Sequence, residues 1–411
     1  MADQARTMTG APAPVLLDRR TPPHIVTLVL ITGVAALNMN MVLPGLPSLA
    51  EYYGADYAVV SLTISAYLAL TAALQLIIGP LSDRYGRRPV ILGSFGVFLC
   101  ATIGCLFAPT IESFLAFRMI QATIASGIAL SRAVVRDTVS TDRAASQIGY
   151  VTMGMALMPM IGPMIGGFLV EGFGWRSIFA FMFVAGLGVT TLAWADLGET
   201  NTTRSTSFGA QFRAYPELFR SRRFWGYSAT AAMASGAFFA FLGGGPWVAS
   251  QVLGLTPSQL GFYFGFIALG YMMGNFLSGR FSAQYGIDRM MLAGAIVSTS
   301  GMALGLAFLA FGIATAPTFF GTILFVGLGN GLVMPNATAG LVSVRPHLAG
   351  SASGLGGALQ IGGGAALSVL AGTLASASAG AAPLVWLMFA CSAMGIVTTL
   401  WVMRVAARHD V

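Results

Sequence analysis

Residues 79–89 read GPLSDRYGRRP, and residues 279–289 read GRFSAQYGIDR. Both segments follow a long apolar run, and they start 200 residues apart. The same residue types recur at four positions, namely Gly79, Ser82, Tyr85 and Gly86 in the first segment and Gly279, Ser282, Tyr285 and Gly286 in the second. The same motif therefore recurs after two separate apolar runs, which indicates an internal repeat in the chain.

The composition indicates a membrane protein. The 411 residues are 56% hydrophobic and 9% charged, with a mean hydropathy of +0.78, whereas soluble proteins carry about 25% charged residues. One membrane span needs about 20 mainly apolar residues. Twelve such runs occur, at roughly 25–49, 58–80, 89–107, 113–135, 146–170, 174–195, 224–250, 259–280, 289–312, 317–341, 351–375 and 383–404. We therefore predict an all-α polytopic membrane protein with twelve transmembrane helices in two six-helix repeats.

The longest polar stretch, at 196–222, separates six apolar runs from the other six. It predicts an N-terminal half at 1–195, a linker at 196–222 and a C-terminal half at 223–411. Paired six-helix repeats are typical of transporters, whose substrate site lies near the membrane midplane. Pairs of small residues four apart, such as Gly270 and Gly274, predict close helix packing.

Charge predicts the orientation of the chain. The 21 basic residues are all arginines. If the N-terminus is cytoplasmic, Arg176 alone lies outside and Arg118 alone lies deep within a span. Every other arginine then falls on the inner side, which is the positive-inside pattern. We therefore predict a multi-pass protein with both termini in the cytoplasm, and a basic excess that serves topology rather than nucleic-acid binding.

The loop at 79–92, GPLSDRYGRRPVIL, joins glycines for a tight turn to one acid and three arginines. It resembles the signature loop of the major facilitator superfamily. The resemblance implies an inner gate in which Asp83 meets the start of the eleventh helix, at 350–354, and Asp137 pairs with Arg87. The predicted gate residues are Gly79, Asp83, Arg84, Gly86, Arg87, Arg88 and Asp137.

The fifth apolar run contains MPMIGPMIGG at 158–167. It resembles the antiporter motif of this superfamily, through Pro159, Gly162, Pro163, Gly166 and Gly167. Three further features are similar to those of one subfamily. They are the extra proline, LPGLP at 43–47 and GGPWVASQVLGLTPSQLGFYF at 244–264. This subfamily is the bicyclomycin and chloramphenicol resistance (Bcr/CflA) group of drug exporters, and the likeness covers nearly the whole chain.

Arg118 and Gln121, in the fourth apolar run, match a motif that this superfamily links to proton transfer. A charge at this depth costs roughly 2.5 to 3.5 kcal/mol on insertion scales, so Arg118 should face acceptors inside the bundle. A purely structural arginine, held by backbone carbonyls, is the alternative.

The first apolar run carries Asn38 and Asn40, which point about 200° apart on a helix. Subfamily members have an aspartate at the position of Asn40. The resemblance therefore favours Asn40 facing the cavity beside Arg118, and Asn38 packing against a neighbouring helix. Asparagine cannot carry a proton. No acid of this chain falls at the predicted midplane. Protons could then couple through Glu112 or the Asp83 and Asp137 cluster, or not couple at all. A shift of the span edges by one turn, which would bring Glu51 or Glu112 deeper, is the third alternative.

The remaining cavity is expected to be apolar and aromatic, since such walls adapt to varied ligands. The predicted substrate-binding or coupling residues are Asn40, Tyr67, Gln75, Glu112, Arg118, Gln121, Phe241, Trp247 and Asn336. A cation at Arg118 without a midplane acid favours neutral or polar substrates over cationic ones.

The predicted function is an inner-membrane multidrug exporter that works by alternating access and proton antiport, on small drugs of the chloramphenicol or bicyclomycin type. An uncoupled facilitator or importer of a small metabolite is the alternative, and a membrane receptor is a third class that the short outer loops disfavour. No catalytic set, metal-ligand spacing or phosphate loop appears, so no enzyme is expected. We expect no cofactor beyond the proton gradient, membrane lipid as surroundings, no nucleic-acid partner and a monomer.

Overall fold

The structure is a computed structural model. It describes residues 14–138, 151, 158, 161–201, 216–345, 348–374 and 380–407. No strand occurs within these ranges, and the described chain is almost wholly helical. The predicted all-α membrane fold is confirmed.

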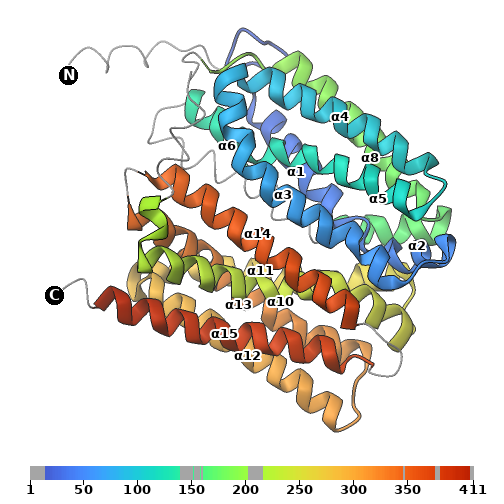
Figure 1. Cartoon of the computed structure of the whole chain (residues 1–411), viewed down its shortest axis with the longest axis vertical. Coiled ribbons are helices and arrows are strands. Elements are labelled where there is room, and N and C mark those ends of the chain that lie inside the picture. Colours follow the sequence, from blue (N-terminus) through green and yellow to red (C-terminus); the bar gives the residue numbers. More distant parts are fainter. Residues whose placement is uncertain are drawn as a thin grey trace. The chain divides into compact units, whose positions relative to one another are not determined.

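In the first half, the helices follow the predicted apolar runs, with breaks inside two of them (Figure 1). The first run bends at a short 3₁₀ turn that carries Pro44, and the fourth contains a 3₁₀ segment directly after Ile120. The elements are α1 (Ile25–Asn40), η2 (Leu43–Gly45), α2 (Leu46–Tyr53), α3 (Tyr57–Tyr85), α4 (Arg87–Phe107), α5 (Ile111–Ile120), η3 (Gln121–Ala125), α6 (Ser126–Thr138) and α8 (Arg176–Asp196).

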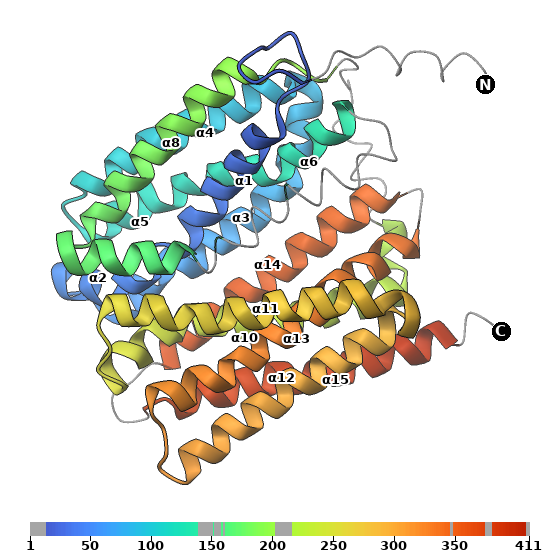
Figure 2. The same cartoon turned by 180° about the vertical axis from the view of Figure 1, so that it is seen from behind.

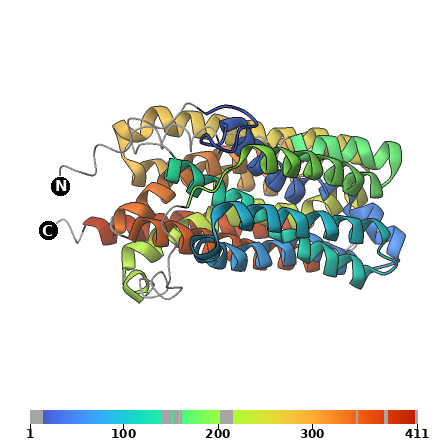
Figure 3. The same ribbon diagram turned by 90° about the horizontal axis from the view of Figure 1, so that it is seen from above.

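The second half consists of long helices that run side by side (Figures 2 and 3). They are α10 (Arg222–Trp247), the π-helical η4 (Val248–Val252), α11 (Pro257–Tyr285), α12 (Ile287–Ala310), α13 (Ala316–Val344), α14 (Ala349–Leu374) and α15 (Ala382–Ala407). Helix α13 packs against both α11 and α12, and α10 packs against α14 and α15.

Eleven helical stretches of the described chain are long and apolar enough to cross a membrane, and Ile161–Phe173 is a shorter apolar helix. This shorter helix is the described part of the predicted fifth span. Most of residues 146–160 of that span, including Pro159, lies outside the described residues.

The repeat seen in the sequence is also present in the helices. Helices α3 and α11 both have 29 residues, and their bounds differ by 200 positions. Each is followed by a glycine with positive φ, Gly86 at 104° and Gly286 at 83°. Such a backbone conformation favours glycine, which explains why this residue recurs where each signature segment turns.

The described chain forms two compact units. Unit 1 runs over Met1–Asn40, Leu74–Gly162 and Arg176–Gly209, and unit 2 over Met41–Ala73, Pro163–Trp175 and Ala210–Val411, in both cases counting only the described residues. Helix α3 contributes to both units. The predicted boundaries at 195 and 223 concern the two sequence halves, and they stay a prediction.

Glycine allows the helices of unit 2 to pack closely. A Cβ atom on Gly270 or Gly274 of α11 would collide with a backbone carbonyl of α13, and the same holds for Gly327 and Gly331 of α13 against α11. The close packing predicted for Gly270 and Gly274 is therefore confirmed. It fits helix association in lipid, where packing replaces the hydrophobic effect.

Candidate functional site

Arg118 is fully buried and lies in a hydrogen-bond network within unit 1. Its Nη1 atom donates to Asn38 Oδ1 at 3.0 Å and to Gln121 Oε1 at 2.8 Å, and Nη2 donates to the Asn38 carbonyl oxygen at 2.8 Å. Gln121 in turn donates from Nε2 to Thr102 Oγ1 at 2.7 Å. The network joins α1, α5, η3 and α4, and its acceptors satisfy a charge that would otherwise be costly in an apolar interior.

The resemblance favoured Asn40 beside Arg118, but the Arg118 contacts described above are to Asn38 and Gln121. The Nδ2 atom of Asn40 donates to the Ala36 carbonyl oxygen of its own helix at 2.9 Å. Its Oδ1 atom is buried and accepts no hydrogen bond from any described group. Such an unsatisfied oxygen is uncommon in a folded interior.

Arg118 and Asp196 are the only buried charged side chains in the described part of the chain. Asp196 is the last residue of α8, where its Oδ1 accepts from the Leu17 backbone N–H at 2.8 Å and its Oδ2 from the His24 N–H at 2.9 Å. It therefore holds the segment that leads into α1. Glu112 is exposed in the first turn of α5.

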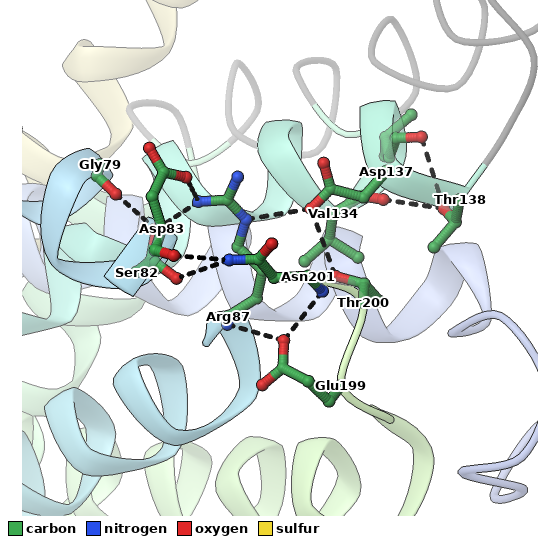
Figure 4. Close-up of polar contacts among 11 residues, drawn as sticks. Gly79, Ser82, Asp83, Arg87, Val134, Asp137, Thr138, Glu199, Thr200 and Asn201 are labelled. Atoms are coloured by element: carbon green, nitrogen blue, oxygen red, sulfur yellow. Dashed lines mark hydrogen bonds and ion pairs between the residues drawn. The ribbon is translucent and has the colours of Figure 1, made fainter. Parts of the chain in front are cut away.

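The signature loop forms a charged cluster at the predicted cytoplasmic end of unit 1 (Figure 4). Arg87 lies between two carboxylates, as it forms an ion pair with Asp83 and donates from Nε to Asp137 Oδ2 at 3.0 Å. It also donates to Ser82 Oγ. These are the Asp137 and Arg87 partners that the resemblance implied. The expected meeting of Asp83 with the start of α14 stays a prediction.

The start of the predicted linker folds onto this loop, which the sequence reasoning missed (Figure 4). Glu199 Oε1 accepts from the backbone N–H groups of Arg87 and Asn201, both at 2.9 Å. Asn201 Nδ2 donates to the carbonyl oxygens of Ser82 at 3.3 Å and Asp83 at 2.9 Å. Glu199 thus caps the first turn of α4, and Asn201 binds the last turn of α3.

Arg88 and Gly86 complete the contact between loop and linker. Arg88 Nε donates to the Leu197 carbonyl oxygen at 2.7 Å, and Nη2 donates to that of Trp194 at 3.2 Å. A Cβ atom on Gly86 would collide with the Glu199 carboxylate. The positive φ of Gly86 therefore favours glycine at this position, and the Glu199 carboxylate lies directly against it.

The described part of the antiporter motif packs tightly inside unit 2. A Cβ on Gly166 would collide with the Met41 carbonyl oxygen, and one on Gly167 with that of Pro257. Gly261 of α11 approaches the Pro163 carbonyl oxygen in the same way. Helix Ile161–Phe173 therefore meets the end of the first span and the start of α11 backbone to backbone.

The other predicted residues are dispersed. Phe241 is fully buried in a cluster with Phe264 and Phe320, with ring centroids 5.1 and 6.0 Å away. Asn336 donates to Ser278 Oγ at 2.8 Å and to the Leu332 carbonyl oxygen at 2.7 Å.

The remaining predicted residues differ in exposure. Tyr67 is buried, Gln75 is half-buried and Arg84 is exposed. The Gly79 carbonyl oxygen accepts a hydrogen bond from the Ser82 hydroxyl. Trp247 lines a cavity of unit 2.

Apolar helices in two related halves, together with a buried arginine network, define this chain as a polytopic membrane transporter. It belongs to the major facilitator superfamily, whose family model matches residues 28–368. The predicted resemblance is thereby confirmed.

The relatives include named resistance proteins. The chain is 30% identical over 335 residues to a chloramphenicol resistance protein of Pseudomonas aeruginosa, covering 79% of each chain. It is 28% identical to a bicyclomycin resistance protein homolog of Haemophilus influenzae, covering 90% of this chain and 94% of the relative. The chain is thus similar to drug-resistance proteins, and the superfamily to which it belongs consists of transporters.

A solved structure shares the fold. The human organic anion transporter MFSD10 (TETRAN) superposes with a TM-score of 0.69 at 18% identity, over 92% of this chain and 98% of that one. At this identity the likeness concerns the fold alone.

Proposed function

We propose that this protein exports small neutral or polar drugs, of the chloramphenicol or bicyclomycin type, across a bacterial inner membrane. The names of the relatives support export of such compounds. Alternating access of the two halves would move the drug, and a proton gradient would drive it. We further propose a monomer that needs no resident cofactor and no nucleic-acid partner, with both termini in the cytoplasm.

The observation that carries the proposal is the buried network of Arg118. Its acceptors Asn38 and Gln121 are neutral amide groups, which hold the guanidinium in the interior of unit 1. A site near this charge favours ligands rich in hydrogen-bond acceptors and disfavours cations. Asn40 belongs to the same helix as Asn38, and its buried Oδ1 lacks a described donor, so a drug hydroxyl or amide could donate to it.

A second candidate function is uncoupled facilitation. Asp196 is the one buried acid in the described ranges, and it lies at the end of α8 rather than within a span. A buried carboxylate that responds to cation binding is the usual intramembrane proton carrier. Its absence from the described interior favours a carrier that equilibrates its substrate.

Flux measurements decide between the two candidates. Purified protein in proteoliposomes would be given chloramphenicol with and without an imposed pH gradient, alongside the Asn40→Asp variant. Uphill movement of chloramphenicol by the wild type only with the gradient would support proton-coupled export. Equilibration by the wild type, with uphill movement by Asn40→Asp, would support the facilitator. No flux of chloramphenicol or bicyclomycin in either protein would contradict the proposed substrate class.

A further inference from the structure

Unit 2 contains a cavity of about 540 Å³ at its predicted outer end. Its walls come from the region of η2 and α2, the start of α3, the end of α10 with η4, and the start of α11. All of its lining residues are described and belong to this one unit. The volume falls within the range of small-molecule sites, about 300–1,000 Å³.

The internal repeat places two equivalent side chains in the wall of this cavity. Glu51 and Gln251 both line it, both are exposed, and their numbers differ by the same 200 positions as α3 and α11. Each precedes by three residues a glycine with positive φ, Gly54 at 59° and Gly254 at 65°. The two turns are therefore alike in backbone and differ in charge, since one carries a carboxylate and the other an amide.

Glu51 gives the cavity its electrostatic character. It is the one charged residue in the lining. The other charged residues of unit 2 that we predict at the outer end are Asp56 and Glu171, which are also acids. A ligand with a negative charge would meet only repulsion here, whereas a cation would be attracted.

Aromatic and apolar groups form the rest of the wall. Tyr57 and Trp247 are half-buried in the lining, and Pro44 and Leu260 are buried there. Aromatic rings attract cations through their electron-rich faces. The cavity thus combines one carboxylate with two rings and an apolar base, which suits a cation that carries an apolar body.

The Tyr57 hydroxyl is a further sign of an open site. Its oxygen is buried beside the backbone of Trp247, yet no described group forms a well-aligned hydrogen bond with it. A buried hydroxyl without a partner costs free energy. A bound water or a polar group of a ligand would satisfy it.

We propose that this cavity binds a monovalent organic cation with an apolar body, such as an aryl quaternary ammonium ion, with Glu51 as its counter-ion and Trp247 and Tyr57 as its aromatic walls. This site is separate from the Arg118 network, which belongs to unit 1. It goes beyond the proposed export of neutral drugs and does not depend on it, because binding can be measured without transport.

The test is to measure equilibrium binding of phenyltrimethylammonium to the full chain in nanodiscs by titration calorimetry. We expect saturable binding that weakens by about fivefold in Glu51→Gln, which corresponds to about 1 kcal/mol. The matched control is Asp56→Asn, an exposed acid in the turn between α2 and α3 that does not line the cavity. It should leave the affinity within about twofold, a change of about 0.4 kcal/mol. The neutral isostere tert-butylbenzene should bind more weakly than the cation.

A second test uses a variant that should bind the cation more tightly. Gln251→Glu adds a carboxylate at the repeat-related position, so it should tighten phenyltrimethylammonium binding. Three results would each overturn the proposal. They are the absence of saturable binding, an equal loss in Glu51→Gln and Asp56→Asn, and equal affinity for the cation and its neutral isostere.

Discussion

Arg118 contacts Asn38 at two points, because one guanidinium nitrogen donates to the side-chain oxygen and another to the backbone carbonyl oxygen. Asn38 lies two residues before the end of α1, so its carbonyl belongs to the last turn of that helix. Carbonyl groups there lack partners within the helix and form the negative end of its dipole. The break of the first span near Pro44 thus creates an acceptor for the buried cation.

This contact predicts unequal effects of the two asparagines on stability. Asn38→Ala removes an acceptor from a buried charge, which costs roughly 1.5–3 kcal/mol. Asn40→Ala removes a hydrogen bond within one helix, at a cost of about 1 kcal/mol. The apparent melting temperature of purified protein should therefore fall further for Asn38→Ala. Equal shifts would contradict the assigned network.

Arg118 should not be replaceable by lysine. The guanidinium reaches three acceptor atoms from two nitrogens, whereas an ammonium group is a single point donor. Arg118→Lys keeps the charge but loses the fork, and we expect drug flux to fall about tenfold, equivalent to about 1.4 kcal/mol. Thr102→Val, at the far end of the network, should have a smaller effect. Full activity of Arg118→Lys would show that charge alone is needed.

Glu199 should protect the backbone amide of Arg87. Its carboxylate accepts this N–H at the first residue of α4, and loss of such a cap typically costs about 1 kcal/mol. In Glu199→Ala, hydrogen–deuterium exchange of the Arg87 amide should be faster than in the wild type. Glu217→Ala is the control, because its ion pair with Arg345 is exposed and contributes little. Unchanged exchange at Arg87 would refute the cap.

The sequence predicted the helices and the repeat well, because both depend on local patterns. Apolar length defines the spans, and glycine at equivalent turns defines the repeat. It could not predict that Arg118 would contact Asn38, because a helical wheel gives the angle between Asn38 and Asn40 but not which faces the fourth span. That choice depends on how α1 packs against η3 and α6 in the fourth span.

Long-range contacts of polar segments were harder to predict. Glu199 and Asn201 belong to a stretch without apolar periodicity, so only its role as a linker could be inferred. Their capping of α3 and α4 depends on the close approach of residues more than 100 positions apart. The one available signal was Gly86 directly before the start of α4. Glycine has no side chain that could cap the helix, so the first N–H groups of α4 need an acceptor from elsewhere.

The glycines of the fifth span provide a final, matched prediction. Gly167 and Gly172 belong to one helix, but a Cβ on Gly167 would collide with the Pro257 carbonyl oxygen, whereas one on Gly172 would meet nothing within 4 Å. Gly167→Ala must therefore push the helix away from the start of α11, and overpacking of this kind costs typically 1–3 kcal/mol. Gly172→Ala should be neutral or slightly stabilising, because alanine favours helix by up to about 1 kcal/mol. Thermal unfolding of both variants in the same detergent tests this. A fall in melting temperature confined to Gly167→Ala is the expected result, and equal behaviour of the two would contradict the backbone contact at Pro257.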